Sequence, residues 1–119
     1  MAVVNRVEQK AYLGKPAIIK LQLITHCFFK NISLTQPELE CLVLLAQDGE
    51  AILNVFCRYV ERKELYASAQ SVRNALNKLE RIGLVQKSGK KNKIIRLSSE
   101  IPIQTEGNIL LEYKFAYVP

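Results

Sequence analysis

The sequence has few of the residues that build catalytic, metal-binding or disulfide-linked sites. Its 119 residues include one histidine, three cysteines and no tryptophan. Cys27, Cys41 and Cys57 are odd in number and form no CxxC pair, so we expect reduced core thiols rather than a disulfide framework or a metal site. His26, flanked by Thr25 and Cys27, is expected to be a packed side chain rather than a general base. No phosphate-binding glycine loop, HExxH or GxSxG motif is present. We therefore expect no enzyme activity, no metal and no cofactor.

Long apolar runs are also missing. The most apolar segment, residues 16–29, is interrupted by Lys20, Gln22 and His26, so it falls short of the roughly 20 apolar residues that a membrane-spanning helix needs. Charged and polar residues stand where a secretory signal would be apolar, namely Arg6, Glu8, Gln9 and Lys10. We expect a cytoplasmic protein that does not contact a membrane.

What remains is typical of an ordinary globular protein. The apolar fraction of 49% and the charged fraction of 24% are close to average. A chain of this length fits one core, so residues 1–119 are expected to form a single domain.

Positive charge is concentrated in one third of the chain. Residues 58–96 contain eleven basic and three acidic residues, a balance of +8, whereas the remainder carries −2. This segregation is typical of a surface that binds a polyanion, although a solvated basic face without a ligand is the alternative interpretation.

Three helices and a hairpin are expected over residues 34–97. Thr35 and Glu38 have the spacing of a capping box, which predicts a helix to about residue 47. Helical apolar spacing predicts a second helix over 51–63 and a third over 69–82, which Ser68 would cap. Short strands over 84–87 and 93–97 flank a glycine- and asparagine-containing turn, which predicts a β-hairpin that we call the wing.

Strands are expected at both ends of the chain. Residues 16–29 alternate in polarity and are rich in β-branched side chains, and residues 10–13 could add a short strand before them. Residues 108–118 alternate in the same way. Segments 10–29 and 108–118 are therefore predicted to be strands that flank the core.

The segment from Ser68 to Val85, SAQSVRNALNKLERIGLV, resembles the recognition helix and first wing strand of winged helix-turn-helix proteins, broadly those of MarR-like prokaryotic and phage regulators. The resemblance covers about residues 34–97, and its most specific part runs from Leu76 to Leu84. It implies an α+β winged-helix fold that reads duplex DNA with helix 69–82 and wing 85–97. The long helices with which MarR-like proteins dimerise have no counterpart in this chain.

The residues on the outer face of the third helix suit this role, because Gln, Asn and Arg can pair with base edges in the major groove. The expected base readers are Gln70, Arg73, Asn74 and Asn77. The expected phosphate ligands are Ser68, Ser71, Lys78, Arg81, Lys87, Lys90, Lys91 and Lys93.

Two functions of different classes fit this pattern. The first is a DNA-binding transcriptional regulator or replication-accessory factor of a bacterium, plasmid or phage. The alternative is a non-catalytic winged-helix module of a phage or mobile element that binds another protein. Exposed apolar anchors on the third helix would favour the alternative, and a basic, amide-rich face favours DNA.

A homodimer through the terminal strands is a further expectation. Strands 16–29 and 108–118 are predicted to lie side by side as an added sheet, and their apolar sides would need a partner that a minimal winged helix does not supply. Two copies would present two recognition helices to DNA.

Overall fold

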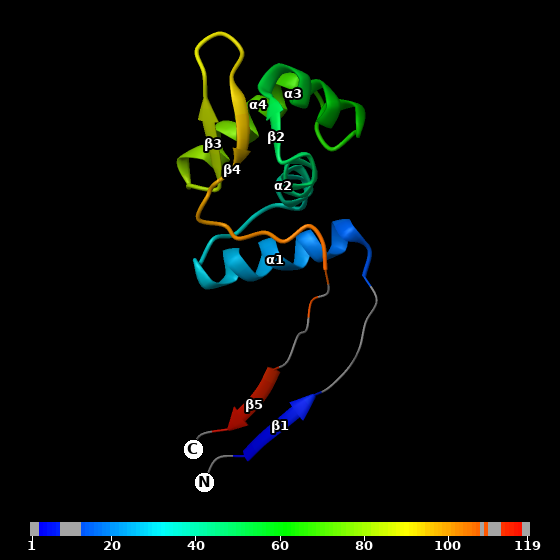
Figure 1. The fold of residues 1–119 in the computed structure, drawn as a ribbon, viewed down its shortest axis with the longest axis vertical. Helices are drawn as coiled ribbons and strands as arrows, with labels where there is room; N and C mark the ends of the chain where they lie inside the picture. Colours follow the sequence, from blue (N-terminus) through cyan, green and yellow to red (C-terminus); the bar gives the residue numbers. More distant parts are fainter. Residues whose placement is uncertain (1–2, 8–12, 108, 110–112, 118–119) are drawn as a thin grey trace.

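The computed structural model describes residues 3–7, 13–107, 109 and 113–117. In these residues the chain forms four helices and five strands, arranged as a helical body with a small sheet and a separate pair of terminal strands (Figure 1). The helices are α1 (Lys15–Phe29), α2 (Gln36–Asp48), α3 (Leu53–Arg62) and α4 (Ala69–Arg81). The strands are β1 (Val3–Val7), β2 (Glu50–Ile52), β3 (Val85–Ser88), β4 (Ile94–Leu97) and β5 (Tyr113–Tyr117).

The helices α2, α3 and α4 confirm the three predicted over residues 34–82. The Thr35 side chain accepts a hydrogen bond from the Glu38 amide, and the Glu38 carboxylate accepts one from the Thr35 amide at 2.8 Å. Both halves of the predicted capping box are therefore present. Ser68 caps α4 by accepting from the Ser71 amide at 3.1 Å.

The strand predicted over residues 16–29 is wrong, because this segment is the helix α1. Its buried residues Ile19, Leu23 and Cys27 recur every four positions, which places them on one side of a helix. Pro16 lies in the first turn, where a proline costs no helical hydrogen bond. The apolar residues of this segment fit the alternating pattern of a strand and also form a stripe along one side of a helix. Packing of that stripe against α2 favours the helix.

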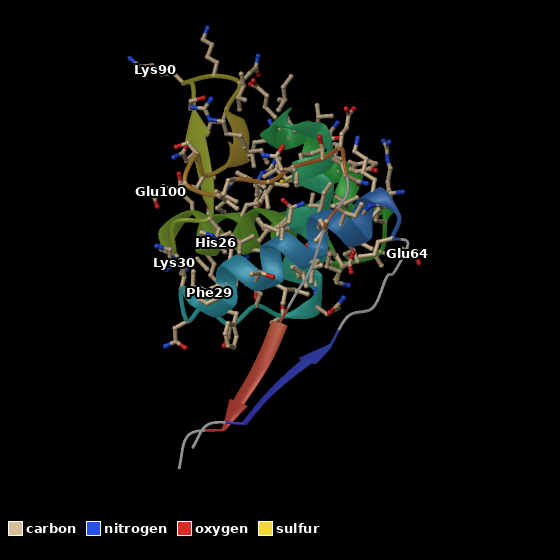
Figure 2. All side chains as sticks on the ribbon, turned by 60° about the horizontal axis from the view of Figure 1, so that its bottom comes forward. His26, Phe29, Lys30, Glu64, Lys90 and Glu100 are labelled. Atoms are coloured by element: carbon tan, nitrogen blue, oxygen red, sulfur yellow. The ribbon has the colours of Figure 1, made fainter. Side chains whose placement is uncertain are left out.

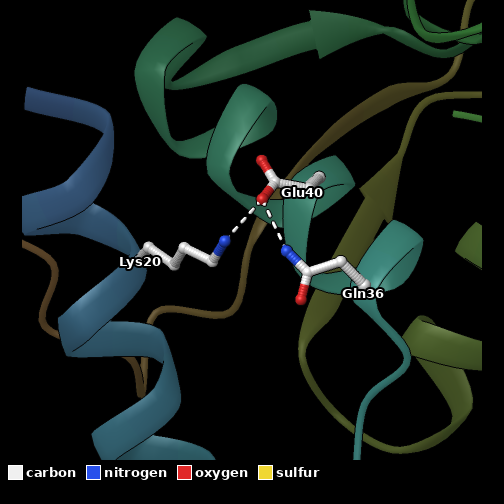
Figure 3. Close-up of polar contacts among 3 residues, drawn as sticks. All are labelled: Lys20, Gln36 and Glu40. Carbon is white, nitrogen blue, oxygen red and sulfur yellow. Dashed lines mark hydrogen bonds and ion pairs between the residues drawn. The ribbon is translucent and has the colours of Figure 1, made fainter. Parts of the chain in front are cut away.

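Polar contacts hold α1 in place on α2. The Lys20 Nζ atom lies 2.6 Å from Glu40 Oε1, which also accepts a hydrogen bond from Gln36 at 2.9 Å (Figure 3). The Gln22 side chain donates to the Gln104 carbonyl oxygen and accepts from its amide, each at 2.8 Å. The chain after the sheet is thereby fixed against α1.

The sheet has the strand order β2-β4-β3 and is antiparallel throughout. Strands β3 and β4 confirm the predicted wing to within a residue at each end. Gly89 in its turn has a φ of +93°, and a Cβ atom there would lie 3.0 Å from the Asn92 carbonyl oxygen, so the turn requires glycine. The three-residue strand β2 overlaps the start of the predicted second helix and is too short to leave a periodic signal. This α+β order is compatible with a winged-helix-like arrangement.

The terminal strands pair with each other, but not as predicted. Strand β5 falls within the predicted segment 108–118, yet its antiparallel partner is β1 rather than any part of 16–29. Leu13 and Ile109, which were predicted to be in strands, belong to none, and the predicted positions 10–12, 108, 110–112 and 118 lie outside the described residues. The pair β1–β5 projects from the α1 side of the body, away from the wing (Figure 1).

One core joins the helical body to the sheet. It is built from the buried faces of α1 to α4 together with β3, β4 and Ile101. The three cysteines lie in this core as free thiols, as predicted. Burial raises the pKa of the Cys41 thiol to about 12, which keeps this side chain protonated at neutral pH.

The helical form of α1 predicts different costs for two neighbouring substitutions. Leu23→Ala should lower the free energy of unfolding by about 2–5 kcal/mol, because it opens a cavity in the core. Thr25→Ala should change it by less than about 0.5 kcal/mol, because Thr25 is exposed and alanine favours a helix. Urea unfolding of both variants measures these values, and comparable losses would contradict the helix.

Candidate nucleic-acid interface

Helix α4 presents one polar face to solvent because its other face is anchored in the core. Val72, Leu76 and Leu79 are fully buried and lie on one side of the helix. The opposite side carries exposed residues at the spacing of successive turns, namely Gln70, Asn74, Asn77 and Arg81. We call these four residues the α4 strip. Three of the four predicted base readers therefore lie on one solvent-facing line.

Hydrogen bonds orient the side chains in and beside the α4 strip. Gln70 donates to the Asn74 side-chain oxygen at 3.1 Å, one turn further along the helix. Arg73, the fourth predicted base reader, is half-buried and donates to the side-chain oxygen of Asn54 on α3. Arg73 thus lies at the edge of the α4 strip and is held by the neighbouring helix.

The tip of the wing presents a second set of cations. Lys90, Lys91 and Lys93 are all exposed in and next to the turn between β3 and β4. Figure 2 shows Lys90 pointing outward from this tip, far from Phe29 and Lys30 at the end of α1. Their exposure is compatible with contact to an external anion, and their role as phosphate ligands stays a prediction.

Lys87 differs from the lysines at the tip. Only 11% of its side chain is exposed. It donates a hydrogen bond to the Asn77 side-chain oxygen and lies 3.5 Å from the Glu80 carboxylate. Lys87 therefore connects β3 to α4, and its predicted role as a free phosphate ligand is not supported by its position.

Lys78 and the serines at the start of α4 also have partners within the protein. The Lys78 Nζ atom lies 2.9 Å from Glu38 Oε2. The Ser68 hydroxyl caps the helix and lies 3.0 Å from the Ser71 hydroxyl. These three residues were predicted phosphate ligands, and the structure assigns them contacts that hold α4 in place.

Glu38 is the buried acid of this region, with only 5% of its surface exposed. Burial alone would raise the pKa of its carboxyl group, but hydrogen bonds from the Thr35 amide and from Lys78, together with the charge of Lys78, outweigh burial and lower the pKa. Glu38 is therefore ionised at neutral pH and pairs α2 with α4.

Several basic and polar residues were not among the predicted site residues. Arg58 and Arg62 are exposed on α3, and Arg96 is exposed on β4. All three belong to the basic segment 58–96. Asn54 was missed because its contact with Arg73 joins residues 19 positions apart.

The described residues contain no group of three or more His, Cys, Asp or Glu side chains arranged to hold a metal ion. No helix among them is long and apolar enough to cross a membrane.

Comparisons with protein-family models, with curated proteins and with solved structures found no match to this chain.

The Glu38 site predicts a pH dependence of stability. Its folded-state pKa is lowered, so its contribution is present at neutral pH and is lost as the pH falls below the ordinary glutamate value of about 4.3. Glu38→Gln should cost about 1–3 kcal/mol at pH 7 and flatten the acid loss of stability. Urea unfolding at a series of pH values measures both effects.

Exposed Glu61 on α3 supplies the control for this measurement. Glu61→Gln should leave the stability at pH 7 nearly unchanged, because isolated surface substitutions cost little. If Glu38→Gln and Glu61→Gln gave the same pH profile, the assignment of Glu38 as a buried ion-pair partner would be wrong.

Proposed function

We propose that this protein binds duplex DNA, with α4 in the major groove and the tip of the wing on the phosphate backbone. The observation that carries the proposal is the combination of the α4 strip with three exposed wing lysines on one scaffold. The contact of Lys87 with Asn77 and Glu80 fixes the wing relative to α4. In this proposal the chain is a winged helix-turn-helix protein.

The dimensions of α4 suit the major groove. A helix of 13 residues is about 20 Å long, and the groove is about 12 Å wide and admits an α-helix. The side-chain amides of Gln70, Asn74 and Asn77 can each donate one hydrogen bond to an adenine edge and accept another from it. The Arg73 guanidinium can donate two hydrogen bonds to the acceptors on a guanine edge. These residues are the proposed base readers.

The phosphate contacts are assigned to a smaller set than the sequence predicted. Arg81 and the wing lysines Lys90, Lys91 and Lys93 are exposed and have positive charge. Ser68, Ser71, Lys78 and Lys87 are better described as residues that hold α4 and the wing in place. Positive charge on the exposed tip would contact phosphates without reading sequence.

A regulator of transcription or a replication-accessory factor of a bacterium, plasmid or phage is the function that best fits this mode of binding. A protein-binding module is the second candidate, and one observation favours it. Ile52, Val55 and Tyr59 are exposed on β2 and α3, where they could anchor a partner. Helix α4 has an exposed large apolar residue only just beyond its end, at Ile82, so the α4 strip itself favours DNA.

The wing lysines predict a sequence-independent effect. Lys90→Ala, Lys91→Ala and Lys93→Ala should each weaken binding to every duplex and reduce the salt slope of the binding constant by about one unit. Fluorescence anisotropy over a range of salt concentrations measures this slope. Lys30→Ala is the matched control, because Lys30 is exposed at the end of α1, away from the tip of the wing (Figure 2). Equal effects of Lys30→Ala and Lys90→Ala would reject the role of the wing.

The α4 strip predicts a sequence-dependent effect. Selection from random duplex DNA at a stated salt concentration supplies the preferred site. Asn74→Ala should then cost about 1–3 kcal/mol of binding free energy on that site and little on random DNA. The two duplexes are compared by the same anisotropy titration. Equal losses on both would exclude base reading by Asn74.

A further inference from the structure

Helix α1 carries the most exposed aromatic residues among those whose side chains the structure describes. Phe28 is 76% exposed and Phe29 is 78% exposed, and their rings pack edge to face with centroids 5.5 Å apart. Ile24, one turn before Phe28, is also exposed. Contiguous apolar groups of this kind mark an interaction surface rather than scattered surface residues.

An apolar cleft adjoins these residues. It has a volume of about 410 Å³ and lies between α1 and residues 101–107 and 109. Ile18, Leu21 and Thr25 line it from α1, and Ile103 and Ile109 line it from the other side. The paired hydrogen bonds between Gln22 and Gln104 hold its two walls together. The cleft is therefore fixed by the fold, and its size falls in the range of about 300–1,000 Å³ that admits ring-sized groups.

The charge of this surface restricts what can cover it. The segment 21–29 contains no acidic residue, no lysine and no arginine. Lys20, just before it, is paired with Glu40. Lys30 directly after this segment and Glu106 in the lining of the cleft are both exposed and have opposite charges, so the surface is close to neutral on a protein with a net charge of +6. A second copy can approach here without the repulsion between like charges that its basic segment 58–96 would produce.

The spacing of the apolar residues on this face also fits a second copy. Half-buried Leu21 and exposed Ile24 and Phe28 follow one another at intervals of three and four, which forms a straight apolar stripe along α1. If two such stripes run antiparallel about a two-fold axis near Ile24, Phe28 of each copy lies over Leu21 of the other.

We propose that the α1 face, defined by Leu21, Ile24, Phe28, Phe29 and the adjoining cleft, is the interface of a symmetric homodimer. This interface replaces the predicted dimer interface, in which residues 16–29 would have formed a strand. The pair β1–β5 projects from the same side of the body (Figure 1). A two-stranded sheet is marginal alone, and a dimer would bring two such pairs together.

The dimer leaves the candidate nucleic-acid interface free. Helix α1 packs on α2, whereas α4 packs on α3 and β3, and the wing lies at the other end of the molecule (Figure 1). Self-association can therefore be measured without DNA, and its outcome is independent of whether the protein binds DNA.

Sedimentation velocity of the full chain over a range of micromolar concentrations tests the interface. The unchanged protein should sediment as a concentration-dependent dimer, and Phe28→Glu should weaken dimerisation by at least about tenfold. Val55→Glu is the matched control, because Val55 is 64% exposed on α3 and lies outside the proposed interface. Circular dichroism of each variant establishes that it is folded.

Cross-linking tests the two-fold axis separately. Ile24→Cys should form a disulfide-linked dimer under mild oxidation, because the axis brings the two copies of residue 24 together, and Val55→Cys should not. A monomer at every concentration would overturn the proposal. Equal weakening by Phe28→Glu and Val55→Glu, or equal cross-linking at both positions, would also overturn it.

Discussion

The Glu38 carboxylate lies where α2 meets α4 and is almost completely removed from solvent. One of its oxygens accepts a hydrogen bond from the Thr35 amide and so completes the capping box at the start of α2. The other pairs with Lys78 on α4. Losing the lysine would leave a buried charge without its cationic partner, which is far more costly than losing a surface ion pair. Together with the buried residues Val72, Leu76 and Leu79, this contact holds α4 with the α4 strip facing outward.

The lysines and the arginine that were predicted to bind phosphate fall into two groups. Lys78 and Lys87 have acidic partners within the protein and connect α4 to α2 and to β3. The lysines at the tip of the wing remain exposed, and so does Arg81 at the end of α4. A cation that is already paired gains less from a phosphate than a free one, because the existing contact must be given up. The second group therefore supplies the charge in the proposed DNA complex.

The sequence predicted the parts of the molecule whose signals are local. The Thr35 and Ser68 caps, the stripes of α2 and α4 and the glycine turn of the wing each depend on neighbouring residues. The partners of Lys78 and Lys87, the strand β2 and the pairing of β1 with β5 depend on residues that are distant in sequence. Segment 16–29 was predicted to be a strand because the spacing of its apolar residues fits both the two-residue period of a strand and the period of a helix. Only its packing on α2 distinguishes the helix from the strand.

Amide chemical-shift mapping of the isotopically labelled protein during titration with duplex DNA tests the central claim most directly. The account predicts that the largest shifts occur at Gln70 and Asn74 on α4 and at residues 90–93 of the wing, with α1 unaffected. A dimer formed through α1 would leave this pattern unchanged. No shifts at low salt, or shifts centred on Val55 and Tyr59 of α3, would contradict the assignment of α4 and the wing as the DNA-binding surface.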